Sequence, residues 1–151
     1  MTYPTDPSAR GKKAVYYAFL VSPLVYIVLM FEMMYFVEWE AMFPFSEVFY
    51  LSLVYALFML VIPKQIKNSI WQKRKASIHT PQEFYSAFFA VSTISVSMAS
   101  GTGVIGLLVY MLSSELMLPI GLCLLGMFGV YINIPKQAEI DEKIREFHFG
   151  G

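Results

Sequence analysis

The fold is decided by residues 84–134, which read FYSAFFAVSTISVSMASGTGVIGLLVYMLSSELMLPIGLCLLGMFGVYINI. Two long apolar runs make up this stretch, Phe84–Leu112 and Leu116–Ile134, and neither contains Lys or Arg. A helix needs about 20 mostly apolar residues to cross roughly 30 Å of hydrocarbon. We therefore predict two membrane-spanning helices joined by a loop of only a few residues.

Two further apolar runs precede this stretch. Ala14–Phe36 is interrupted by one charge, Glu32, and Val48–Ile62 is at the short end of what can span a bilayer. Over the chain of 151 residues, 57% are hydrophobic and 15% are charged, whereas a soluble domain has about 25% charged residues. We predict an all-α membrane protein with four transmembrane helices.

The basic residues are distributed asymmetrically along the chain. All eleven lie before the first run, after the second or after the fourth. The loops after the first and third runs carry glutamates instead, namely Glu38, Glu40, Glu47 and Glu115. Since Lys and Arg are enriched in the cytoplasmic loops of membrane proteins, we predict that both chain ends lie on the cytoplasmic side.

The chain also repeats itself. Ile-Pro-Lys-Gln at 62–65 recurs at 134–137, and Phe-Leu-Val-Ser at 19–22 matches Phe-Ala-Val-Ser at 89–92. Each unit holds two spans, so both units have the same orientation, unlike the inverted repeats of many transporters. We predict two tandem parallel-repeat hairpins, which divide the chain into a polar segment at 1–13, a first unit at 14–79 and a second unit at 80–151.

A basic segment follows the second run. After Pro63, the side chains of Ile66, Ile70 and Trp71 share one helical face among five basic residues. A helix of this kind lies on the membrane surface and attracts anionic lipid head groups. The alternative is a basic loop that only fixes the topology. The predicted membrane-surface residues are Lys64, Lys67, Trp71, Lys73, Arg74 and Lys75.

A second amphipathic helix is predicted after the fourth run. There Ile140, Ile144 and Phe147 recur at three- to four-residue spacing among mixed charges. This pattern suits a cytoplasmic helix that is solvated on one face and packs against protein on the other.

The third span has a clear start signal. Thr80 is the expected N-cap, proline follows it, and Glu83 completes a capping box. We expect the third helix to begin before it reaches the hydrocarbon.

Small residues recur on one face of the third span and at two positions of the fourth. Because small side chains let membrane helices approach closely, we predict tight packing between these spans. The predicted packing residues are Ser92, Ser95, Ala99, Gly103 and Gly106 in the third span and Gly121 and Gly129 in the fourth. The alternative is a polar path that Ser97, Ser100 and Thr102 would line.

Glu32 is the only ionisable residue within a predicted span. Such residues are costly in the membrane and are candidates for function. Its position toward the end of the first span leaves two interpretations open: an interfacial glutamate that reaches water, or a buried functional one. Together with Ser97, Ser100 and Thr102, it forms the candidate polar membrane site.

The sequence offers no group of residues for catalysis or metal binding. Cys123 is the single cysteine, and His79 and His148 both lie outside the spans without a Cys or His nearby. The ten methionines are flexible apolar filler by composition. We expect no enzymatic activity, no cofactor, no metal and no nucleic-acid partner.

Residues 97–108, Ser-Met-Ala-Ser-Gly-Thr-Gly-Val-Ile-Gly-Leu-Leu, precede a short loop, an apolar span and Ile-Pro-Lys at 134–136. This arrangement resembles a group of uncharacterised four-span bacterial inner-membrane proteins, which look distantly similar to the proteolipid (subunit c) hairpins of rotary ATPases. The resemblance implies the same fold and an inner-membrane location. Members of that group often carry a glutamate where this chain has Ser100, so ion carriage of the proteolipid kind is not implied.

Two functions remain from the sequence. The first is a non-catalytic subunit or accessory protein of a larger inner-membrane complex, with membrane lipids and other membrane subunits, or further copies of the chain, as partners. The second is a small oligomeric channel, transporter or proteolipid-like ion-translocating protein. An intramembrane enzyme is the least favoured.

Overall fold

The computed structural model describes residues 7–37 and 40–147, and within these residues it is all-helical, with no strand. Three helices are long: α1 spans Pro7–Phe36, α2 spans Phe45–Lys75 and α3 spans Pro81–Ser113. Two shorter helices follow, α4 over Met117–Asn133 and α5 over Gln137–Arg145. The predicted all-α class is therefore confirmed for the described part of the chain.

Three to four of these helices can cross a membrane. α1, α2 and α3 are each long and apolar enough, whereas α4 has 17 residues and reaches that length only when taken together with α5. A bend of 41° separates α4 from α5. At 1.5 Å per residue α4 is about 25 Å long, a little less than the hydrocarbon thickness. The fold is compatible with a multi-pass membrane protein.

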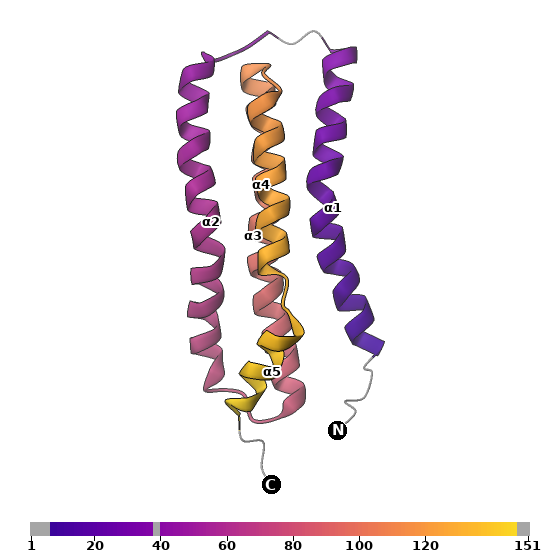
Figure 1. The fold of residues 1–151 in the computed structure, drawn as a ribbon, viewed down its shortest axis with the longest axis vertical. Helices are drawn as coiled ribbons and strands as arrows, with labels where there is room; N and C mark the ends of the chain where they lie inside the picture. The colour runs from indigo at the N-terminus through magenta and orange to yellow at the C-terminus, as the bar shows by residue number, and fades with distance from the viewer. Residues whose placement is uncertain (1–6, 38–39, 148–151) are drawn as a thin grey trace.

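The α3–α4 pair forms the centre of the molecule (Figure 1). The two helices run antiparallel, and both α1 and α2 contact this pair, from opposite sides. As a result, α1 does not pack against α2 in the way that α3 packs against α4. The two sequence units are thus not two equivalent hairpins in space, because the second unit lies between the two helices of the first.

The repeated Ile-Pro-Lys-Gln sequence adopts two different conformations. Pro63 lies inside α2, which continues to Lys75, whereas Pro135 lies in the break between α4 and α5. The segment after Pro63, predicted as a helix on the membrane surface, is helical and continues α2 to Lys75. Proline removes one helical hydrogen bond, yet α2 continues past it, and Trp71 beyond it packs against Phe84 and Phe88.

The start of α3 agrees with its sequence signal. The Glu83 amide donates to Thr80 Oγ1 at 3.2 Å, and the Thr80 amide donates to Glu83 Oε2 at 3.2 Å. This reciprocal pair satisfies two amides that the first turn would otherwise leave without partners. The predicted capping box is confirmed.

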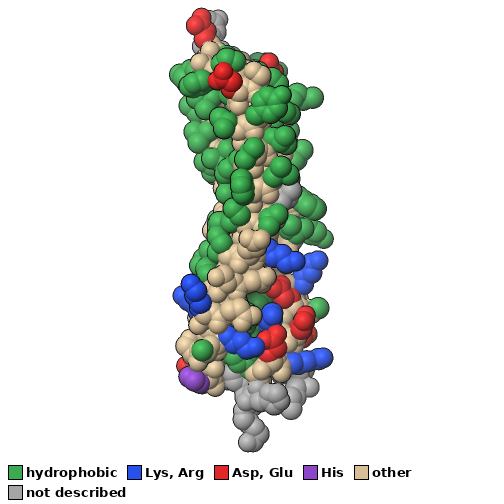
Figure 2. Space-filling view, turned by 90° about the vertical axis from the view of Figure 1, so that its left-hand side faces the viewer, with side chains coloured by type: hydrophobic (Ala, Val, Ile, Leu, Met, Phe, Trp, Pro, Cys, Tyr) green, Lys and Arg blue, Asp and Glu red, His purple; other side chains and the backbone are tan. Residues whose placement is uncertain are grey.

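The charged side chains are concentrated at one end of the molecule. Figure 2 shows Lys and Arg gathered over this end, beyond a broad hydrophobic surface. We call it the basic end; it contains the last turns of α2, the α2–α3 turn and α5. The α3–α4 turn lies at the opposite end.

Candidate functional site

The α3–α4 seam is held close by glycines. A Cβ added at Gly106 would lie 2.8 Å from the Pro119 carbonyl oxygen and 3.0 Å from Cys123 Sγ. A Cβ at Gly126 would lie 3.2 Å from the Gly103 amide nitrogen. A real Cβ at Gly106 would force the Pro119 backbone to move, and one at Gly126 would require a shift of a few tenths of an ångström, so glycine at these positions allows the two backbones to approach closely.

The predicted small residues of α3 are all buried, but they face different partners. Ser92 and Ser95 are completely buried and Ala99 is 1% exposed. A Cβ at Gly103 would meet the Tyr26 ring at 3.0 Å and Pro23 Cβ at 3.1 Å, so Gly103 also faces α1. The face of α3 that carries the small residues therefore packs against α1 as well as α4.

In α4 the two predicted packing glycines differ. A Cβ at Gly129 would lie 3.2 Å from Ala99 Cβ, whereas Gly121 is exposed and no described atom would lie within 4 Å of its Cβ. The prediction for Gly121 is wrong because its helical position turns it away from α3. Gly126, which the sequence analysis missed, occupies the seam instead. The signal was its spacing: Pro119, Cys123, Gly126 and Val130 recur every three to four residues and are buried.

Ser95 joins three helices at one buried point. Its Oγ lies 3.1 Å from the Pro63 carbonyl oxygen of α2 and 2.8 Å from Asn133 Oδ1 of α4. Asn133 Nδ2 in turn donates to the Gly129 carbonyl at 2.8 Å. A hydroxyl has one proton, so it donates to one acceptor at a time. The arrangement ties the proline position of α2 to the end of α4.

The candidate polar path is not brought together by the structure. Ser100 Oγ lies 2.7 Å from Ser22 Oγ of α1, Thr102 is 1% exposed and interacts with Tyr55 of α2, and the Ser97 hydroxyl donates to the Ile94 carbonyl of its own helix at 2.9 Å. These three side chains point toward different partners. Ser100 and Thr102 serve contacts between helices and Ser97 a contact within its own helix, so the three do not line a common channel within one chain.

Glu32 does not join these residues either. It is exposed on α1 and forms no hydrogen bond or ion pair with any residue that the structure describes. The structure therefore places it on the outer surface of the helix assembly, where lipid, water or another protein would meet it.

An aromatic cluster fills the basic end. Trp71 of α2 is 4% exposed, and its ring contacts Phe84 and Phe88 of α3, with centroids 5.5 Å away in both cases. Phe147, after α5, also contacts Trp71, with 6.1 Å between the ring centroids. Trp71 was predicted to lie at the membrane surface; in the structure its side chain is buried against other helices. Aromatic side chains bury large apolar areas, and here they fasten α2 to α3.

Ion pairs fasten α5 to α2. Lys67 Nζ lies 2.6 Å from Glu139 Oε1, and Lys75 Nζ lies 2.7 Å from Glu146 Oε2. Lys67 and Glu139 follow the repeated Ile-Pro-Lys-Gln at equivalent positions, so the repeat carries opposite charges that pair with each other. Hydrogen bonds from Lys75 and then Lys143 lower the pKa of the Glu146 carboxyl.

The predicted membrane-surface residues thus fall into two groups. Lys67, Trp71 and Lys75 face α3 or α5, whereas Lys64, Lys73 and Arg74 are exposed and form no ion pair within the described ranges. The second group is available to lipid head groups or solvent.

A small cavity, the α2–α5 cavity, lies within the basic end. Its volume is about 10 Å³, which is room for roughly one water molecule. Trp71 Nε1 is buried and lacks a hydrogen-bond partner in the described part of the chain. The cavity is lined by Lys67, Asn68, Trp71, Phe88, Val91, Glu139 and Lys143.

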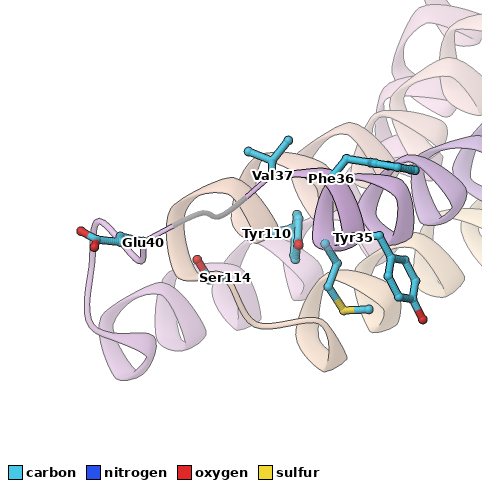
Figure 3. A pocket seen from close by; sticks show the side chains of 7 residues that line it. Tyr35, Phe36, Val37, Glu40, Tyr110 and Ser114 are labelled. Carbon is cyan, nitrogen blue, oxygen red and sulfur yellow. The ribbon is translucent and has the colours of Figure 1, made fainter.

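A wider depression of about 800 Å³ lies at the opposite end (Figure 3). It opens between the end of α1 and the end of α3 and is lined by Met34, Tyr35, Phe36, Val37, Glu40, Tyr110 and Ser114. Glu40 is the one ionisable acid of this lining, at its far side from Tyr35 in Figure 3.

Among the residues that the structure describes, no group of three or more His, Cys, Asp or Glu side chains could hold a metal ion. Comparison of the chain with protein-family models, with curated proteins and with solved structures gives no match.

Proposed function

We propose that this chain is a non-catalytic integral membrane subunit or accessory protein of a larger inner-membrane complex. The observation that carries the proposal is the lateral exposure of α1 and α2. In the most apolar stretch of each helix, 17% of the residues of α1 and 12% of those of α2 are buried, against 50% of those of α3. Two long apolar helices therefore keep most of their surface free for neighbouring membrane helices or lipid.

The proposal includes an orientation. Lys and Arg side chains gather at the basic end, as Figure 2 shows for one face, and basic residues favour the cytoplasmic side. We place the basic end and both chain ends in the cytoplasm. The chain then crosses the inner membrane four times, with α4 as the fourth crossing.

The interior of the single chain supports a structural role over transport. The buried hydroxyls of Ser95 and Ser100 bond to groups of other helices. They are occupied in holding helices together, which supports a packing function. A homo-oligomeric channel would have to build its path between chains.

Site-specific photo-crosslinking in living cells tests the proposal. A photoreactive side chain replaces Val28 of α1 or Leu57 of α2, which are 56% and 59% exposed. The matched control position is Met30, on α1 and fully buried. We expect Val28 and Leu57 to crosslink to defined membrane proteins that mass spectrometry identifies, and Met30 to give only intrachain products.

Two outcomes would contradict the proposal. Crosslinks to lipid alone at both exposed positions would indicate a chain that works without partners. Crosslinks exclusively to further copies of the chain would favour the oligomeric channel or transporter instead.

A further inference from the structure

The α2–α5 cavity has more hydrogen-bond donors than acceptors. Lys67, Asn68, Trp71 and Lys143 bring N–H groups to its lining, and Glu139 supplies the one carboxylate. Trp71 is 4% exposed, yet its Nε1 has no partner in the described ranges. A buried N–H without an acceptor costs free energy. The indole N–H of Trp71, a residue of the lining, is therefore short of an acceptor.

The ion pair of Glu139 indicates which kind of chemical group binds in the cavity. Its Oε1 sits 2.6 Å from Nζ of Lys67, a side chain that is only 11% exposed. A lysine this well buried requires an anionic partner, because an unpaired charge would be strongly destabilising. Lys143 also lines the cavity. It brings a second positive charge, in addition to that of Lys67, and so adds to the attraction for anionic oxygen.

The cavity lies at the depth of lipid head groups in the proposed orientation. The apolar part of α2 ends at Ile62, and Lys67 follows five residues later, about 7.5 Å further along the helix. The head-group layer adds roughly 5–8 Å to each side of the hydrocarbon. A lipid phosphate is therefore at the level of Lys67, while the exposed Lys64 stands one turn nearer the hydrocarbon.

We propose that the α2–α5 cavity is a binding site for the phosphate of an anionic lipid, which replaces the Glu139 carboxylate on Lys67. One phosphate oxygen accepts from Trp71 Nε1, and the phosphate occupies the place that the carboxylate leaves. The nine residues of α5 are held to α2 by the Lys67–Glu139 and Lys75–Glu146 pairs. Loss of the first pair loosens α5, so lipid binding and α5 docking compete.

This inference rests on the membrane orientation in the proposed function but not on a partner complex. Its test uses the full chain with Trp39→Phe, which leaves Trp71 as the single tryptophan and gives one indole N–H signal in nitrogen–proton correlation spectra. The chain in non-ionic micelles is titrated with phosphatidylglycerol, with phosphatidylcholine and with inorganic phosphate. We expect a saturable shift of the indole signal with phosphatidylglycerol and none with phosphatidylcholine.

Matched charge variants separate the site from general attraction. Glu139→Gln removes the internal competitor, whereas Glu142→Gln removes the same charge from an exposed position of α5. We expect Glu139→Gln to tighten phosphatidylglycerol binding roughly tenfold relative to Glu142→Gln. This factor corresponds to the net contribution of one charge-assisted hydrogen bond. Lys67→Gln weakens binding by a similar factor relative to Lys73→Gln, and Lys67→Arg, which keeps the charge, retains binding.

Three results would overturn the inference. The first is an indole signal that does not move with phosphatidylglycerol. The second is equal affinity for the site variants and their charge controls, which would leave only diffuse attraction to the basic end. The third is the same saturation with inorganic phosphate alone, which would assign the site to free phosphate. The crosslinking outcomes at Val28 and Leu57 are independent of all three.

Discussion

Gly106 allows α3 and α4 to approach closely, because a Cβ at this position would lie 2.8 Å from the Pro119 carbonyl oxygen and 3.0 Å from Cys123 Sγ. The contact on one side is backbone, which cannot move away as a flexible side chain can. At the residue scale, the close packing of α3 against α4 therefore depends on glycine, which has a hydrogen atom where other residues carry a Cβ. Gly121, in the same helix as Pro119, has no such neighbour.

The glycine pair gives the first prediction. Gly106→Ala should destabilise the chain by about 1–3 kcal/mol, the usual cost of overpacking. Gly121→Ala should be neutral or should stabilise by up to about 1 kcal/mol, because alanine favours helix over glycine. Unfolding of both variants in mixed micelles by increasing dodecyl sulfate measures the difference. Equal stability of the two variants would contradict the close seam.

The second prediction concerns the serine that joins three helices. Ser95→Ala removes the hydroxyl between the Pro63 carbonyl and Asn133 Oδ1 and takes away the one proton that these two buried acceptors share, at a cost of about 1–2 kcal/mol. Ser97→Ala is the control, because that hydroxyl donates only within its own helix turn. The same unfolding assay applies, and a loss at Ser97 as large as at Ser95 would count against the three-helix contact.

Several of these residues could be identified from the sequence and others could not. The three- to four-residue spacing of small side chains in the third span indicated one buried face, and the structure buries it. Two glycines eight residues apart in the fourth span did not define a face, so Gly121 was misassigned and Gly126 was missed. Tertiary packing decides which helix covers a face of small residues. The spacing of residues along one segment of the chain does not carry this information.

At the scale of elements, the basic end joins α2, α3 and α5 through rings and ion pairs. The Lys75–Glu146 pair, at 2.7 Å, ties the end of α5 to α2, and the Lys143–Glu146 pair, at 3.2 Å, lies within α5 and its C-cap. Such exposed pairs contribute little alone. They act together with the Lys67–Glu139 pair and the contact of Phe147 with Trp71.

The third prediction is a pH dependence of α5 docking. Since Lys75 and Lys143 lower the pKa of Glu146 in the folded chain, the pair is fully formed above the ordinary carboxyl pKa and is lost as the pH falls through the lowered value. In the Trp39→Phe chain, acidification should change the Trp71 emission as Phe147 leaves it. Glu146→Gln should remove this transition, because the variant side chain carries no carboxylate to protonate. An unchanged transition in that variant would contradict the assignment.

The helices themselves follow closely from hydropathy and local signals. The four apolar runs and the Thr80–Glu83 capping box anticipated α1 to α4 and the start of α3. The conformation of the chain at Pro63 and Pro135 did not follow from hydropathy and local signals in the same way. The same four residues, Ile-Pro-Lys-Gln, continue a helix at 62–65 and lie at the break between two helices at 134–137, so their local sequence alone does not determine the conformation.

At the scale of the whole molecule, the central α3–α4 pair is covered by α1 on one side and α2 on the other (Figure 1). The sequence repeat suggested two equal hairpins, but repeats fix the order of elements and not their contacts. The arrangement leaves two lateral apolar faces and puts the basic residues of α2 and α5 at one end. Both features follow from how the helices are placed, and both support the proposed role in a membrane assembly.

The most direct test of the account is the side of the membrane on which the basic end lies. In a Cys123→Ser background, single cysteines replace Ser77 in the α2–α3 turn and Met42 between α1 and α2, both exposed. A membrane-impermeant maleimide is then added to intact spheroplasts. We predict that Met42→Cys is labelled at once and that Ser77→Cys is labelled only after permeabilisation. Labelling of Ser77→Cys in intact spheroplasts would contradict the orientation on which the account depends.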